Sequence, residues 1–183
     1  MSFFCRKIFY DQKNHRVVTN IPENEFPKPS IPPVNRESKP VLTEQDLRQI
    51  AQNYQAVPGH SQAGHRIGLR NLGNSCYMNS IIQSLSFIPK LANYFLSGDF
   101  SKSINRQNKF GSGGAVVNEW FKLMIMLSTR QYSYVVPYPF KYTVGKLQQA
   151  YLGTQQQDAH EFLIFLLDAL HEDLNQVREN HWH

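Results

Sequence analysis

The residue with the clearest chemical potential is Cys76, which lies inside the stretch GLRNLGNSCYMNSIIQSL, residues 68 to 85. Apolar residues recur after it at helical spacing, which predicts a helix that begins near Asn74 or Ser75 and carries Cys76 in its first turn. Free backbone N–H groups and the positive end of the helix dipole favour a thiolate there over a thiol. Because a thiolate is a strong nucleophile, this position suits covalent catalysis.

Asn71, five residues before the thiol, is the second candidate for chemistry. Its side-chain amide can donate a hydrogen bond to an oxyanion near the sulfur, as acyl transfer requires. Gly73 allows a sharp turn and a close approach of a substrate backbone. Two plainer interpretations stand beside these: a lone helical cysteine is usually buried and inert, and a loop asparagine often bonds its own backbone.

The elements that must position these groups are mostly helices, which are expected from residue 67 onward. Pro89 ends the first helix, a short helix over LANYFLSG closes at Gly98, and residues 115–129 form a helix with a broad apolar face. YSYVVPYP is extended, and another helix covers roughly 139–151. The last helix lies within DAHEFLIFLLDALHEDLNQ and carries an apolar stripe of Phe162, Leu163, Leu166, Leu167, Leu170 and Leu174. The fold class expected for this chain is therefore mainly α.

Residues 1–66 differ in composition from the rest of the chain. Seven of the ten prolines lie there, and the segment IPENEFPKPSIPPVNRESKP has almost no periodic apolar pattern. Proline removes backbone donors and fixes φ, so an extended, largely disordered linker is expected over residues 1–66. Within it, TEQDLRQIAQNY, residues 43–54, predicts a short helix with Thr43 as N-cap and Asp46 at the third helical position.

Composition excludes several classes of protein. The net charge is +5, but the lysines and arginines are scattered and no stacking aromatics accompany them, so a nucleic-acid module ranks last. Two cysteines make neither a disulfide framework nor a zinc site, and no metal or cofactor is expected. No apolar run approaches the ~18 residues of a membrane span, and charge appears too early for a signal peptide. The reducing cytosol or nucleus is the expected compartment.

Two motifs resemble those of a known family. The stretch around Cys76 resembles the cysteine box of the ubiquitin-specific proteases, which are papain-like deubiquitinases, with Ser75 where the family usually has threonine. The swap keeps a hydroxyl and is expected to be tolerated. GTQQQDAHEFLIFLLDAL, residues 153–170, resembles the family's Gln-Gln-Asp box. The resemblance covers about residues 67–177, and it implies that residues 67–183 form the helical thumb of a papain-like α+β cysteine protease fold.

The resemblance implies a role for each matching residue. Cys76 would attack the carbonyl after the last glycine of ubiquitin and form a thioester that water hydrolyses. Asn71 falls on the oxyanion-hole asparagine. Gln156, Asp158 and Glu161 fall where the family contacts the arginine-bearing ubiquitin tail. Asp158 three residues before Glu161 is also a capping-box pattern, and the two roles are compatible.

A thiol protease also needs a histidine base, which the family takes from a glycine-rich His-Tyr motif. None of the seven histidines stands in such a context: His160 and His171 lie in the last amphipathic helix, where solvent exposure is expected, and the His-x-His pair in ENHWH is a poor basis for a metal site. The family's zinc-ribbon cysteine pairs are also absent. The 183 residues therefore correspond to the thumb without the sheet that carries the base. Either they are a fragment or the gene product is truncated, and little or no activity is expected of them alone.

Finer features narrow the resemblance and leave one alternative. PVNRESKP, LANYF, INRQN, RQYSY, TVGKL and LHEDLN resemble the endosome-associated branch of the family. The partners expected are ubiquitin, ubiquitinated proteins and endosomal sorting machinery, and the location expected is cytoplasmic with endosome association. The alternative is a catalytically dead interaction or scaffold protein that binds partners through the linker or a residual surface.

Overall fold

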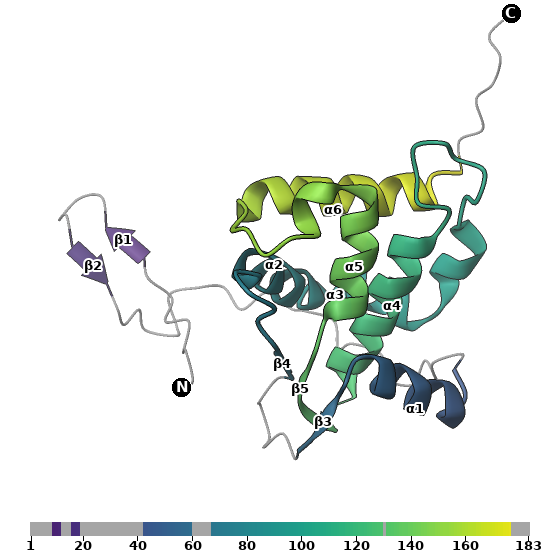
Figure 1. Ribbon diagram of the computed structural model, residues 1–183, viewed down its shortest axis with the longest axis horizontal. Helices are drawn as coiled ribbons and strands as arrows, with labels where there is room; N and C mark the ends of the chain where they lie inside the picture. The colour runs from purple at the N-terminus through teal and green to yellow at the C-terminus, as the bar shows by residue number, and fades with distance from the viewer. Residues whose placement is uncertain (1–8, 12–15, 19–41, 60–66, 130, 177–183) are drawn as a thin grey trace, which may run out of the picture. The chain divides into compact units, whose positions relative to one another are not determined.

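The computed structural model describes residues 9–11, 16–18, 42–59, 67–129 and 131–176 (Figure 1). A hairpin of β1 (Phe9–Asp11) and β2 (Arg16–Val18) belongs to one unit of the chain, residues 1–33, and its strands pair antiparallel. All other described elements belong to the second unit, and their described part, residues 42–176, is called the helical body here. The rest of the predicted linker, including residues 19–41, lies outside the described residues.

The helical body is mainly α, as the sequence predicted. Its helices and strands are α1 (Glu44–Asn53), β3 (Val57–Pro58), β4 (Gly68–Leu69), α2 (Cys76–Ser86), α3 (Pro89–Leu96), η1 (Asp99–Ser103), α4 (Ala115–Ser128), β5 (Tyr132–Val135), α5 (Tyr138–Leu147), η2 (Gln149–Tyr151) and α6 (Ala159–Leu174). No helix among the described residues has the length and apolar character that crossing a bilayer would require.

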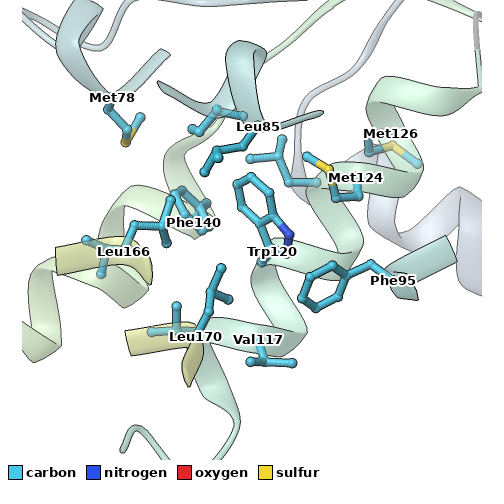
Figure 2. Close-up of a cluster of buried hydrophobic side chains, with 14 of the residues drawn as sticks. Met78, Leu85, Phe95, Val117, Trp120, Met124, Met126, Phe140, Leu166 and Leu170 are labelled. Carbon is cyan, nitrogen blue, oxygen red and sulfur yellow. The ribbon is translucent and has the colours of Figure 1, made fainter. Parts of the chain in front are cut away.

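A cluster of large apolar side chains from five helices forms the core. Trp120 of α4 is fully buried and lies among Leu85 of α2, Phe95 of α3, Phe140 of α5 and Leu170 of α6 (Figure 2). Its ring centroid is 5.9 Å from that of Phe140 and 6.3 Å from that of Phe95. Each fully buried side chain of this kind stabilises the fold by about 1.5–3 kcal/mol, so α4 is held from several sides.

The predicted apolar stripe of α6 is only partly buried. Phe162, Leu166 and Leu170 are in the core, but Leu167 is 43% exposed. The helix packs against α2 and α4, and Leu167 lies at the edge of its broad apolar stripe, where the side chain faces outward. Leu167 therefore belongs to the apolar stripe but not to the buried face of α6.

The short helix predicted before the body is present and well capped. The Thr43 hydroxyl accepts from the Asp46 N–H at 3.2 Å, and the Asp46 carboxylate accepts from the Thr43 N–H at 2.9 Å. This reciprocal pair confirms the predicted capping box. The helix packs on α4, where the fully buried Tyr54 donates its hydroxyl to the Glu119 carboxylate at 2.9 Å. Residues 43–58 thus fold onto the body, whereas an extended linker was expected up to residue 66.

Three short strands lie side by side at one end of the helical body (Figure 1). The central strand, β5, pairs antiparallel with β3 and parallel with β4. The Arg70 N–H continues the β4 pairing by donating to the Val135 carbonyl at 2.9 Å. This pairing fixes the chain immediately before Asn71, so the small sheet directs the cysteine loop, residues 70–75, toward the start of α2.

Candidate active site

Cys76 is the first residue of α2, and its side chain is exposed. The prediction that it lies in the first turn of a helix is confirmed. At this position the first-turn N–H groups have no partners within the helix. The neighbours Tyr77 and Met78 are buried, so the thiol lies on the outward side of this turn.

The cysteine loop is folded around the buried hydroxyl of Ser75. That side chain is fully buried, accepts from the Leu72 N–H at 2.8 Å and lies 3.1 Å from the Asn71 carboxamide oxygen. It does not cap α2 itself. A hydroxyl at this position therefore holds the loop together, which sequence reasoning noted only as a tolerated replacement for threonine.

Asn71 has its carboxamide oriented by three donors. Its Oδ1 accepts from the Gly73 N–H at 3.0 Å, the Ser75 N–H at 3.1 Å and the Ser75 hydroxyl. Because the oxygen is held by these donors, the NH₂ group points away from them, and it has no partner among the described residues. Asn71 thus bonds its own loop backbone, and its exposed side chain, five residues before Cys76, keeps an NH₂ group with no partner in the described part of the chain.

The cysteine loop contacts a second loop that precedes α6, residues 152–158, called the tail loop here. Gly73 (φ 89°) and Asn74 (φ 49°) take up left-handed backbone conformations, and the Asn74 amide donates to the Thr154 carbonyl at 3.1 Å. A Cβ at Gly73 would lie 3.3 Å from the Thr154 methyl carbon. The two predicted boxes are therefore brought together by a direct hydrogen bond between loops 80 residues apart in sequence.

Asp158 is the N-cap of α6. One of its carboxylate oxygens accepts from the His160 N–H at 2.7 Å and the Glu161 N–H at 3.0 Å. These bonds, the one from Glu161 first, lower the pKa of Asp158 below its ordinary value of 3.8. The capping interpretation holds for this half only, since no bond from the Asp158 N–H to the Glu161 carboxylate is formed. The second carboxylate oxygen of Asp158 accepts no hydrogen bond from the described residues.

Gln156 and Glu161 are both exposed near the same helix start. The negative charges of Glu161 and Asp158 act on Tyr151, whose pKa is raised first by its burial and then by these two carboxylates. The Tyr151 ring packs on Phe162 at 5.1 Å between centroids and on Tyr77 at 6.0 Å. An aromatic cluster thereby ties the first turn of the cysteine helix to the helix start that carries both acids.

Polar side chains of α2 and α5 make contacts that the sequence alone does not reveal. Asn79 fixes α2 against the preceding segment by donating to the Leu69 and Arg70 carbonyls at 3.3 and 3.2 Å. The Ser80 hydroxyl, by contrast, donates to the Tyr77 carbonyl of its own helix. The sequence does not mark Lys141 as functional, because a single lysine within a helical pattern is usually exposed to solvent.

The described histidines do not complete a base. His160 and His171 are exposed on α6, as predicted, and the other five histidines lie outside the described residues. Within the described part of the chain, no group of three histidine, cysteine or acidic side chains could hold a metal ion.

Comparisons with known proteins agree with the two boxes. The sequence model of the family described as ubiquitin carboxyl-terminal hydrolase matches residues 67–183. Ubiquitin carboxyl-terminal hydrolase 15 of Xenopus tropicalis is 43% identical over 129 residues, which are 69% of this chain and 13% of that protein. The Homo sapiens protein of the same name is 45% identical over 112 residues, covering 61% of this chain and 11% of its own length.

Ubiquitin carboxyl-terminal hydrolase 4 of Mus musculus is 41% identical over 128 residues, 69% of this chain and 13% of that protein. The chain thus spans only about an eighth of the length of these curated relatives. The match nevertheless covers the whole segment from the strand before Asn71 to the end of α6. On this ground the chain belongs to the ubiquitin-specific protease family of ubiquitin carboxyl-terminal hydrolases.

Proposed function

We propose that the chain supplies the nucleophile and the substrate-tail cleft of a cysteine-type deubiquitinase, which hydrolyses the bond after the C-terminal glycine of ubiquitin. The observation that carries this proposal is the exposed Cys76 at the first turn of α2, which follows a loop where Asn71 keeps an amide donor that no described residue occupies. Family membership supports the reaction class, and the relatives are themselves named ubiquitin carboxyl-terminal hydrolases.

In the proposed reaction the thiolate of Cys76 attacks the carbonyl carbon of the scissile bond, and the carbonyl oxygen becomes an oxyanion. The Asn71 NH₂ group donates to that oxyanion, because its carboxamide is already oriented by the cysteine loop. Collapse of the intermediate expels the leaving amine, which takes up a proton, and leaves a thioester. Water then hydrolyses the thioester, releasing the ubiquitin carboxylate and the thiol.

The proposed tail-binding residues are Gln156, Asp158 and Glu161. Asp158 is held ionised by two backbone donors, and its second oxygen can pair with an arginine of an extended peptide. The exposed Gln156 and Glu161 add an amide and a carboxylate to the same edge. The Asn74–Thr154 hydrogen bond supports the proposal, since it links this edge to the nucleophile's loop.

We infer further that these 183 residues alone turn over ubiquitin amides poorly, because no histidine in the sequence stands in a Gly-Gly-His-Tyr context. A fluorogenic ubiquitin C-terminal amide tests this inference. Robust release of the fluorophore that Cys76→Ala abolishes would contradict it, whereas its absence fits a thumb that carries a nucleophile without its base.

Labelling by a ubiquitin vinyl-sulfone probe tests the proposed nucleophile directly, in a Cys5→Ser background so that Cys76 is the single thiol. The expected result is faster labelling by the ubiquitin probe than by a glycine vinyl sulfone without ubiquitin, and no labelling of Cys76→Ala. Equal rates for the two probes would refute recognition of ubiquitin. Equal rates combined with retained partner binding would favour the catalytically dead scaffold instead.

For cellular context, we propose a cytoplasmic protein that meets ubiquitinated cargo and the endosomal sorting machinery. The support is limited to the short segments that resemble the endosome-associated branch, among them LANYF in α3 and LHEDLN at the end of α6. Imaging of the tagged chain with an endosomal marker tests the proposal, and a uniform cytoplasmic signal would contradict the endosomal part.

A further inference from the structure

Lys141 on α5 is a buried cation that bonds backbone carbonyls. The residue is only 5% exposed, and its ammonium group donates to the Leu152 carbonyl at 3.0 Å and to the Gly153 carbonyl. Burial lowers the pKa of Lys141. It forms no ion pair with any carboxylate in the described residues. Burying an ammonium group removes its hydration, which costs free energy. Because no described carboxylate pairs with Lys141, the hydrogen bonds to the two carbonyls are the main interactions that offset this cost.

The helix backbone reaches the same loop one turn later. Gly145 is buried, and a Cβ there would lie only 2.8 Å from the Leu152 Cα. Residues four apart on a helix share a face, so Lys141 and Gly145 together seat the start of the tail loop on α5. The charged ammonium group of Lys141 holds the carbonyls of the tail loop, and the missing side chain of Gly145 allows the backbone of that loop to approach α5.

The seated loop then reaches the nucleophile. The residue after Gly153 is Thr154, whose carbonyl accepts from the Asn74 amide at 3.1 Å, two residues before Cys76. Downstream, the same loop ends at Asp158, the N-cap of α6. A continuous series of contacts therefore runs from Lys141 through the tail loop to Asn74 in the cysteine loop, and the same loop ends at the proposed tail-binding carboxylate of Asp158.

We propose that Lys141 is a positioning residue, which sets the tail loop at the register that holds the cysteine loop and the ubiquitin-tail carboxylates at a working separation. The substrate part of this statement rests on the function proposed above. Lys141 touches neither substrate nor thiol; it acts through the carbonyls of Leu152 and Gly153. The competing view is that Lys141 only adds to overall stability, and the two views predict different patterns of local protection.

The test is amide hydrogen exchange, read residue by residue by NMR, on the 183-residue chain with Lys141→Met. This substitution keeps an unbranched side chain that is one atom shorter and removes the ammonium group with its charge. Losing two charge-assisted bonds should speed exchange by about tenfold or more in residues 152–154 and 72–76, while the amides of α4 keep their protection. The matched control is Lys146→Met: this lysine is exposed on the same helix, 4.6 Å from the Tyr142 ring centroid, and no change is expected.

Two further variants separate positioning from general stability. Gly145→Ala keeps the lysine but pushes Leu152 away, so it should loosen the same two segments. Asn74→Gly suits the left-handed backbone and removes only the link to Thr154, so residues 72–76 should lose protection while 152–154 keep theirs. In the Asn74→Gly background, Lys141→Met should add nothing further to exchange at 72–76.

Several outcomes overturn the proposal: faster exchange confined to 152–154, additive effects in the double variant, unchanged exchange, or loss of protection throughout α4. A Lys141→Met chain that does not fold would also overturn it, because a positioning residue leaves α4 intact.

A second readout uses labelling of Cys76 in the Cys5→Ser background. Lys141→Met should slow labelling by ubiquitin vinyl sulfone several-fold but leave alkylation by iodoacetamide unchanged, since the thiol stays exposed. If the unsubstituted chain shows no preference for the ubiquitin probe, the proposed function fails. The exchange measurements still decide whether Lys141 positions the loops.

Discussion

The buried hydroxyl of Ser75 offers the sharpest test of how the cysteine loop is held. Ser75→Ala removes the acceptor of the Leu72 N–H, which then loses its partner at 2.8 Å. It also removes one of the three donors to the Asn71 oxygen. An unsatisfied buried donor costs about 1–3 kcal/mol, and Leu72 is only half-buried. We therefore expect a loss of about 1–2 kcal/mol in the free energy of unfolding, or ~3–6 °C in Tm for a body of this size.

Urea and thermal unfolding followed by circular dichroism measure this loss, and the exchange rate of the Leu72 amide reports the broken bond directly. Ser75→Thr keeps the hydroxyl and should retain the protection of that amide. Ser80→Ala is the control, because this exposed hydroxyl bonds only its own helix, at the Tyr77 carbonyl. The reasoning is refuted if Ser75→Ala and Ser80→Ala change stability alike, or if Leu72 exchange is unaffected.

Three further outcomes are expected. Asp173→Asn should lower the urea midpoint by an amount equivalent to about 2–3 kcal/mol, because the buried carboxylate accepts three hydrogen bonds at the start of α4. Asp168→Asn, at an exposed position on the same helix as Asp173, should have little effect, and equal effects would contradict this reasoning. Tyr54→Phe should cost about 1 kcal/mol through its lost bond to Glu119, with α1 amides exchanging faster than those of α4; uniform changes would argue against local docking. Because the pKa of Asp158 is lowered in the folded chain, its ionised carboxylate stabilises the fold above its ordinary pKa of 3.8, and this contribution is lost as the pH falls through the lowered pKa. The difference in urea midpoint between the chain and Asp158→Ala should therefore be constant near neutral pH and shrink as the pH falls below 3.8; a difference that does not shrink would be inconsistent.

The sequence by itself determined the local elements of this protein and the two boxes. Apolar spacing predicted α2, α4 and α6, and the Thr43–Asp46 pair predicted the start of α1. It also put Cys76 in a first helical turn. These features depend on residues within one or two turns of each other, so periodicity and capping chemistry are sufficient to read them.

Only the tertiary structure decided which donors and acceptors meet across the chain. Asn74 meets Thr154 across 80 residues, and Asp173 meets Ser112 across 61. No local pattern distinguishes a lysine that will bond buried carbonyls from one in solvent, so Lys141 was invisible in the sequence. The exposure of Leu167 was decided in the same way, by how many neighbouring elements cover α6. Such contacts depend on the path of the whole chain, because they join groups that are far apart in sequence. The residues next to each group therefore do not predict its partner.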